Sequence, residues 1–114
     1  MLAAKQRIRK DREFDSVFKG GRSYYSDSLG LKVKKNNLDY NRFGLIISLK
    51  VSKKAVSRNL LRRRVREIIR HQNENLKPGF DCVFIFFPLI LDKNFQELET
   101  AIILSFKKAG LYND

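Results

Sequence analysis

Basic side chains are concentrated in one segment of the chain, residues 55–70, with the sequence AVSRNLLRRRVREIIR. Six of its sixteen residues are arginines, and Glu67 is its only acidic residue. Solvated helices usually mix the two signs of charge at i,i+4 spacing, so this excess is unusual. Guanidinium groups are planar, forked donors that suit the oxygens of phosphates. The segment therefore predicts contact with a polyanion rather than covalent chemistry.

The same segment has the apolar spacing of an amphipathic helix. At about 100° per residue, one arc of such a helix holds Leu61, Val65, Ile68 and Ile69. A neighbouring arc holds Asn59, Arg62, Arg63, Arg66 and Arg70, and Arg58 stands at the helix start near the boundary. We expect a helix from about Val56 to His71 with one side on the core. Asn59 is a candidate either for contacting a base edge or sugar or for bracing a neighbouring side chain.

The other reactive residue types form no catalytic or metal-binding pattern. The acidic residues outside the helix that could serve catalysis fall into two groups far apart in the sequence. One group is Asp11, Glu13 and Asp15, and the other is Glu97 and Glu99. No H-x-E, D-x-D or Ser/His/Asp arrangement occurs, and His71 is the only histidine. Cys82 is the only cysteine, which excludes an internal disulfide and favours a buried thiol in a reducing cytoplasm. We expect no catalytic residue and no metal held by protein side chains alone.

Composition indicates one folded domain over residues 1–114. Hydrophobic residues make up 43% of the chain, and its net charge of +12 favours phosphate polymers, with nucleic acid first and an anionic membrane second. Lys50, Lys53 and Lys54 precede the arginine helix and bring nine of the 24 basic residues into 21 positions. Residues 1–10 lack the hydrophobic region of a signal peptide. They carry a basic cluster before the first helix, which we expect to be a mobile arm. The longest apolar run, Val83–Leu91, contains Pro88 and is too short to span a membrane.

The elements around the arginine helix follow from periodicity and turn signals. We expect a helix over Asp11–Lys19 with Asp11 as N-cap, strands over Ser28–Lys34, Phe43–Leu49 and Phe80–Phe87, and a last helix capped by Asp92 and ended by Gly110. Tyr24 and Tyr25 start the first strand or form a short one before it. The core stripe of the last helix is expected to be Phe95, Leu98, Ala101, Ile102, Leu104 and Phe106. The order α-β-(β)-β-α-β-α predicts an α+β two-layer sandwich with helices on a small mixed sheet.

RNA fits this pattern better than duplex DNA. The chain has no helix-turn-helix, zinc-finger spacing or zipper, whereas aromatics beside strands suit unstacked single strands. Phe14 and Phe18 stand at i,i+4 in the first helix. Periodicity assigns them to the core, although a helix beside an open sheet face could also present their rings to a bound strand.

Residues 53–67, KKAVSRNLLRRRVRE, resemble the bacterial ribonuclease P protein subunit family, whose signature has the form A-V-x-R-N-x-x-K/R-R-x-x-R-E. The matching positions are Ala55, Val56, Arg58, Asn59, Arg62, Arg63, Arg66 and Glu67. The resemblance extends over nearly the whole chain, through residues 7–21, the strand GLIISLK and the strand FDCVFIFF. It implies an α-β-β-β-α-β-α fold with a left-handed β-α-β crossover.

The resemblance also implies a function. Proteins of this family are cofactors of a ribozyme, the ribonuclease P endonuclease, whose RNA subunit hydrolyses precursor tRNA with Mg²⁺ to give the mature 5′ end. It implies that the catalytic RNA is bound by Arg58, Asn59, Arg62, Arg63, Arg66 and Arg70. The single-stranded 5′ leader of precursor tRNA would lie in a cleft lined by Phe14, Phe18 and Lys32, with Lys50 as a backbone contact.

Two departures from the family pattern bear on these roles. The segment between Ser48 and Ala55 is one residue longer than usual, which leaves open whether Lys53 or Lys54 holds the family position. Lys32 stands where an aromatic is common. A ribosomal-type RNA-binding protein with no ribozyme partner is the alternative, and a stand-alone nuclease is a more distant one.

Overall fold

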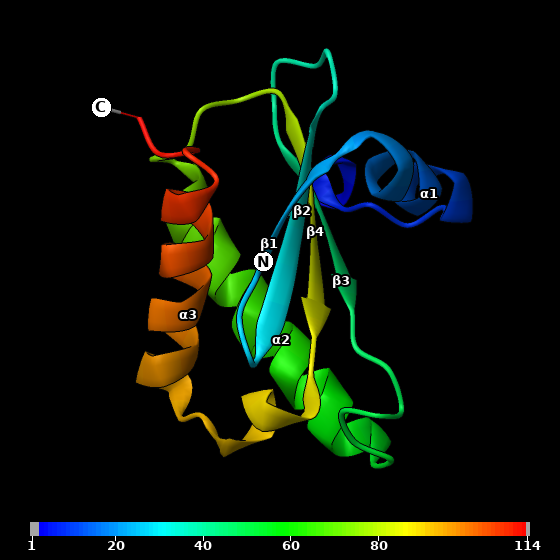
Figure 1. Cartoon of the computed structure of the whole chain (residues 1–114), viewed down its shortest axis with the longest axis vertical. Helices are drawn as coiled ribbons and strands as arrows, with labels where there is room; N and C mark the ends of the chain where they lie inside the picture. The colour runs from blue at the N-terminus through cyan, green and yellow to red at the C-terminus, as the bar shows by residue number, and fades with distance from the viewer. Residues whose placement is uncertain (1–2, 114) are drawn as a thin grey trace.

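The computed structural model describes residues 3–113. Within that range the elements follow the order η1 (Ala4–Gln6), α1 (Asp11–Gly20), β1 (Arg22–Tyr25), β2 (Leu29–Lys35), β3 (Arg42–Ile46), α2 (Ala55–Asn73), β4 (Phe80–Phe86), η2 (Pro88–Asp92) and α3 (Phe95–Lys108) (Figure 1). The predicted α-β-β-β-α-β-α order is confirmed, with Tyr24 and Tyr25 in a strand of their own. No helix in the described range has the length and apolar character needed to cross a bilayer.

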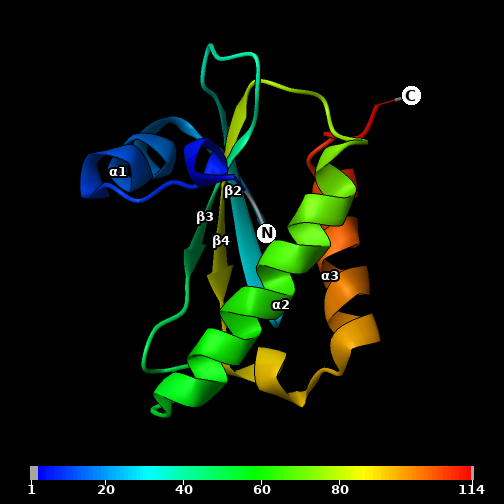
Figure 2. The same ribbon diagram turned by 180° about the vertical axis from the view of Figure 1, so that it is seen from behind.

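The four strands form a mixed sheet in the order β1-β2-β4-β3. β2 pairs antiparallel with both β1 and β4, whereas β3 and β4 are parallel neighbours. The parallel pair is joined by α2, and Figures 1 and 2 show that this crossover is left-handed. Most β-α-β crossovers are right-handed. The left-handed crossover that the family resemblance implied is therefore present.

One face of the sheet is covered by α2 and α3 (Figure 2). Alternating residues of β2 and β4 point to this side, namely Leu29, Leu31, Val33, Cys82, Phe84 and Phe86. They pack against the apolar arc of α2, formed by Leu61, Val65, Ile68 and Ile69, as its spacing predicted. Phe106 of α3 lies at the centre, with its ring edge-on to Phe43, Phe84 and Tyr112. Cys82 is completely buried in this core, as predicted, and burial raises the pKa of its thiol.

The opposite face is covered at one end only, by α1 (Figure 1). Val17 of α1 and Val83 of β4 are fully buried there, and Phe14 and Phe18 are half-buried. The Phe14 ring lies directly over Gly44 of β3, because a Cβ at that glycine would be 2.6 Å from the ring. Gly44 therefore lets α1 approach the sheet closely.

Ion pairs fasten α1 to the two parallel strands. The Arg42 guanidinium of β3 donates to Glu13 of α1 at 2.5 Å and to Asp81 of β4 at 2.7 and 2.9 Å. Asp81 is only 6% exposed and also accepts a hydrogen bond from the Asn36 amide at 2.9 Å. The hydrogen bond between Arg42 and Asp81 raises the pKa of Arg42. This network therefore ties the start of α1 to β3 and, through Arg42, to β4.

The N-terminal segment packs against the sheet and is not a mobile arm. Arg7 forms a parallel bridge with Phe43, and the backbone N–H of Ile8 donates to the Phe43 carbonyl at 2.8 Å. Ile8 is 5% exposed because its side chain fills the space between α1 and β3. The prediction of a mobile arm over residues 1–10 is therefore wrong for residues 3–10. Residues 1 and 2 lie outside the described range.

Both predicted helix N-caps are displaced. α1 begins at Asp11 itself, with Lys10 at the N-cap. Asp92 ends η2, and Asn94 caps α3: its Oδ1 accepts the Glu97 N–H at 2.9 Å, while Glu97 accepts the Asn94 N–H at 3.0 Å. This reciprocal pair is a capping box.

Two further predictions about element content are corrected. The strand expected to reach Leu49 ends at Ile46, because the chain turns there and the Val51 N–H donates to the Ser48 carbonyl. In α3, Leu98, Ile102 and Phe106 are buried as predicted. Phe95 and Leu104 are 43% and 50% exposed, so they lie outside the core stripe.

Candidate RNA-binding surface

The polar side of α2 is an arginine-lined surface with a hollow of about 300 Å³. The hollow is lined by Asn59, Arg62, Arg63, Arg66 and Glu67. Asn59 accepts a hydrogen bond from Arg62 at 2.9 Å, so in this structure it braces a neighbouring guanidinium. Four residues of the predicted arc, Asn59, Arg62, Arg63 and Arg66, thus line one hollow, and we call them the arginine surface.

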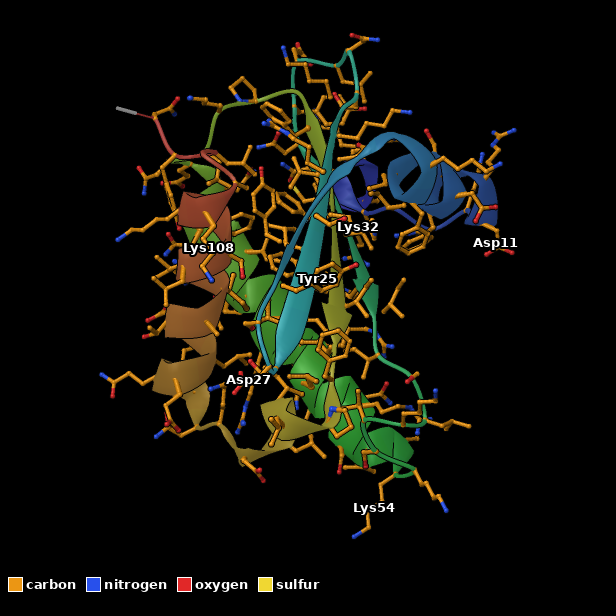
Figure 3. The ribbon with its side chains drawn as sticks, in the orientation of Figure 1. Asp11, Tyr25, Asp27, Lys32, Lys54 and Lys108 are labelled. Atoms are coloured by element: carbon orange, nitrogen blue, oxygen red, sulfur yellow. The ribbon has the colours of Figure 1, made fainter. Side chains whose placement is uncertain are left out.

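The loop before α2 carries the predicted lysines. Lys50, Lys53 and Lys54 are all exposed, and Lys54 points away from the body of the protein (Figure 3). Arg58, half-buried at the start of α2, donates to the Ser52 carbonyl at 2.8 Å. Arg58 therefore holds the loop that carries these lysines against the start of α2.

Two arginines of the N-terminal segment extend the arginine surface. Burial lowers the pKa of Arg66, and the charges of Arg7, Arg62 and Arg9 lower it further. The charges of Arg7 and Arg9 therefore act on the same guanidinium as that of Arg62 and add positive potential on this side of α2. No local pattern in the sequence indicates this effect, because it depends on the packing of Ile8 under α1.

Arg70 differs from the other arginines of α2. Its guanidinium donates to Glu67 at 2.6 Å, and His71 Nε2 lies 3.1 Å from the same carboxylate. The hydrogen bond from Arg70 lowers the pKa of Glu67 to about 2. The structure therefore joins Arg70 to an acidic partner, whereas Arg62 and Arg66 line the hollow.

A second hollow, of about 550 Å³, lies between α1 and the edge strand β3. Its lining residues are Asp11, Phe14, Asp15, Phe18, Leu45, Ile46, Ile47 and Arg62. We call it the aromatic cleft. Arg62 lines both hollows, so the arginine surface of α2 continues into the cleft around the β3 edge.

Of the other predicted cleft residues, Lys32 lies beside the cleft and Lys50 does not line it. The Lys32 ammonium is 5.5 Å from the centre of the Phe18 ring and donates to Ser23 at 3.0 Å. Figure 3 shows Lys32 on the sheet next to α1. Lys50 lies in the loop after β3, outside the lining of the cleft.

Two carboxylates at the cleft were not predicted as site residues. Asp11 and Asp15 line it one helical turn apart on α1, whereas Arg62 belongs to α2. They would repel a phosphate backbone and favour its passage along the Arg62 side. Within residues 3–113, no three His, Cys, Asp or Glu side chains converge as potential metal ligands.

The fold and these surfaces define a class: a small α+β protein with an arginine-lined helix that opens into an aromatic cleft. The sequence model described as Ribonuclease P matches residues 2–110. The chain therefore belongs to the ribonuclease P protein family, whose members are protein components of a tRNA-processing ribonuclease complex that contains RNA. The family resemblance drawn from the α2 motif is confirmed.

Individual relatives agree along nearly the full chain. A ribonuclease P protein component of Clostridium botulinum is 41% identical over 108 residues, 94% of this chain and 96% of the relative. One from Synechocystis sp. is 34% identical over 106 residues, 92% of this chain and 86% of the relative.

Solved structures of such proteins share the fold. The RNase P protein of Thermotoga maritima superposes with a TM-score of 0.81 at 31% identity, covering 90% of this chain and 96% of that one. The RNase P protein of Staphylococcus aureus gives a TM-score of 0.88 at 24% identity, covering 95% and 98%.

Proposed function

We propose that this protein binds the catalytic RNA of ribonuclease P through its arginine surface and the 5′ leader of precursor tRNA through its aromatic cleft. Removal of the leader then gives the mature 5′ end of the tRNA. Arg62 carries this proposal, because it lines both hollows and so joins the two binding surfaces.

The charge distribution on α2 supports the contact with the catalytic RNA. Arg62, Arg63 and Arg66 line one hollow, and the charges of Arg7 and Arg9 also act on Arg66. Folded RNA presents closely spaced phosphates, and forked guanidiniums can contact two of their oxygens at once. Arg58 contributes by holding the loop of Lys53 and Lys54, and Arg70 adds charge at the far end of the same helix.

The cleft supports the contact with the leader. Its floor is apolar, and Phe14 and Phe18 are half-buried, so part of each ring is accessible to an unstacked base. Aromatic side chains stack on bases of any sequence, which suits leaders that differ from one tRNA to the next. Lys32, over the Phe18 ring, and Arg62, in the cleft lining, would contact the backbone, and Lys50 extends the positive charge beyond the cleft.

We assign the hydrolysis to the RNA subunit and its Mg²⁺ ions. The carboxylates at the cleft, Asp11 and Asp15, are a pair without a third ligand among the described residues. RNA phosphates would supply the hard oxygen ligands that Mg²⁺ prefers. The protein contributes by binding and orienting substrate. The buried Cys82 thiol suits a reducing cytoplasm, where we place this activity.

Reconstitution tests the proposal directly. Purified protein, a bacterial ribonuclease P RNA and precursor tRNA are combined with low Mg²⁺, and the released leader is measured with each component omitted in turn. We expect no cleavage by the protein alone, slow cleavage by the RNA alone and much faster cleavage by the two together. Cleavage by the protein without RNA would support a nuclease. No stimulation, together with stable binding to ribosomal subunits, would support the ribosomal-type alternative.

A further inference from the structure

The face of the sheet that α1 leaves open carries a second aromatic surface beyond the cleft. Tyr25 of β1 is 54% exposed, and its ring stacks on Phe87 with centroids 6.4 Å apart and planes at 27°. Figure 3 shows Tyr25 on the sheet below Lys32 and α1. Single exposed aromatics are common on protein surfaces. Two stacked rings on an open sheet face are a more specific arrangement.

Strand register places this pair on the same face as the cleft. Tyr25 is opposite Gly30, Gly30 is opposite Ile85, and Ile85 is opposite Ile46. Partners in register share a face of the sheet. Ile46 lines the aromatic cleft, and both isoleucines pack against the α1 cluster. The Tyr25 row is therefore a continuation of the cleft floor.

Gly30 lets the Tyr25 ring lie flat on the sheet. A Cβ at Gly30 would be 2.5 Å from two carbons of that ring, so any side chain there would displace it. The ring thus has one side on the backbone of β2, with the nearly parallel Phe87 ring beside it, and Tyr25 is still 54% exposed. Its remaining surface is available to a ligand.

A basic side chain lies between the cleft and this pair. Lys32 is two residues from Gly30 on β2, about 6.6 Å along the strand, and its ammonium lies over the Phe18 ring. The order across the face is therefore aromatic, cation, aromatic. Alternating stacking surfaces and cations on an open sheet are the means by which proteins bind unstacked single strands.

We propose that Tyr25, supported by Phe87, is a stacking site for a leader base one or two nucleotides beyond those held by Phe14 and Phe18. This inference rests on the proposed function, since the occupant is the same single strand as it leaves the cleft. Charge complementarity and continuity with the cleft floor select this occupant over a protein partner. The site would lengthen the leader segment that the protein holds without adding base specificity.

The test uses the full-length protein with the RNA subunit and precursor tRNAs that carry a single 2-aminopurine at successive leader positions. Stacking quenches this fluorophore. With the native protein we expect quenching at positions in the cleft and at one or two positions beyond it. Tyr25→Leu should restore the fluorescence of the outer positions only. It should weaken binding of long-leader substrate about tenfold, the loss typical of one stacked base.

Matched variants and leader lengths separate this site from general effects. Tyr25→Phe keeps the ring and should behave as the native protein. Phe95→Leu alters a ring of similar exposure, 43%, on α3 and should also change nothing. A leader cut back to the cleft should abolish the difference between Tyr25→Leu and native protein. Thermal midpoints identify any variant with impaired folding, and Phe87→Leu then serves as the second variant, with a smaller loss of the same kind.

Two results would contradict the inference in different ways. If Tyr25→Leu and Phe87→Leu leave quenching and affinity unchanged at every leader length while the protein still stimulates cleavage, the stacking site is wrong and the proposed function stands. If the native protein neither stimulates cleavage nor quenches any leader position, the proposed function fails and the inference fails with it.

Discussion

The two faces of the sheet are built differently. The face under α2 and α3 has a continuous core, with Phe84 and Phe106 completely buried. The face under α1 has a small core around Val17 and Val83, with ion pairs that hold the helix in place and half-buried rings at its margin. The first face stabilises the fold, and the second leaves part of its apolar surface accessible. The face under α1 can remain partly uncovered because the core under α2 and α3 supplies most of the hydrophobic stabilisation of the protein.

Core truncation gives the largest expected contrast between the faces. Phe106→Ala should lower the free energy of unfolding by about 3–5 kcal/mol, because it leaves a cavity among three aromatic rings. Phe18→Ala on the open face should cost about 1 kcal/mol, since its ring is only half-buried. Urea denaturation measures both. Equal losses would mean that both faces contribute alike to folding.

Removing Arg42 tests whether ion pairs hold the open face together. Arg42→Met leaves the buried Asp81 carboxylate without its cation and should cost about 2–3 kcal/mol, below the full range for a buried pair because the Arg42 side chain is 21% exposed. Arg12→Met, an exposed arginine on α1, is the control and should change stability by less than about 0.5 kcal/mol. If the two variants lose the same stability, the network does not fasten α1.

The pH dependence of stability should show a smaller effect of the same network. Burial alone would raise the pKa of Glu13, but hydrogen bonds from the Lys10 and Arg9 backbone and the charge of Arg42 lower it below the ordinary value of 4.5. A lowered pKa in the folded state means that this carboxylate stabilises the fold above about pH 4.5. Its contribution is lost as the pH falls through the lowered value. Glu13→Gln should therefore be less stable than native protein at pH 6, and the gap should narrow by pH 3. An equal difference in stability between Glu13→Gln and native protein at pH 6 and at pH 3 would contradict this role of the Glu13 carboxylate.

Much of the fold was predictable because apolar periodicity is a local property. Leu61, Val65, Ile68 and Ile69 recur at helical spacing and Leu29, Leu31 and Val33 alternate, and each set is buried as a unit. The start of α3 was missed although a local signal exists. Asp92 and Asn94 can both cap a helix, and only Asn94 has a glutamate three residues later to complete a capping box.

The candidate site was predictable in its residue types and less so in its arrangement. The arginines of α2 share a face because helical geometry puts them there. The approach of Arg7 and Arg9 to Arg66 depends on Ile8 docking under α1, which no local pattern encodes. The Asp11 and Asp15 carboxylates at the cleft and the stacked Tyr25–Phe87 pair likewise arise from the way separate strands and helices meet.

The central claim is that the arginine surface and the aromatic cleft bind different RNAs. Its most direct test is one set of titrations of native protein, Arg66→Met and Phe18→Leu against the RNA subunit alone, and of each reconstituted complex against precursor tRNA with and without its leader. Arg66→Met should weaken binding of the RNA subunit and reduce the salt slope by about one counterion, with leader preference retained. Phe18→Leu should bind the RNA subunit normally and lose the preference for a leader. If each variant weakens both interactions in the same proportion, the two surfaces act as one and the account is wrong.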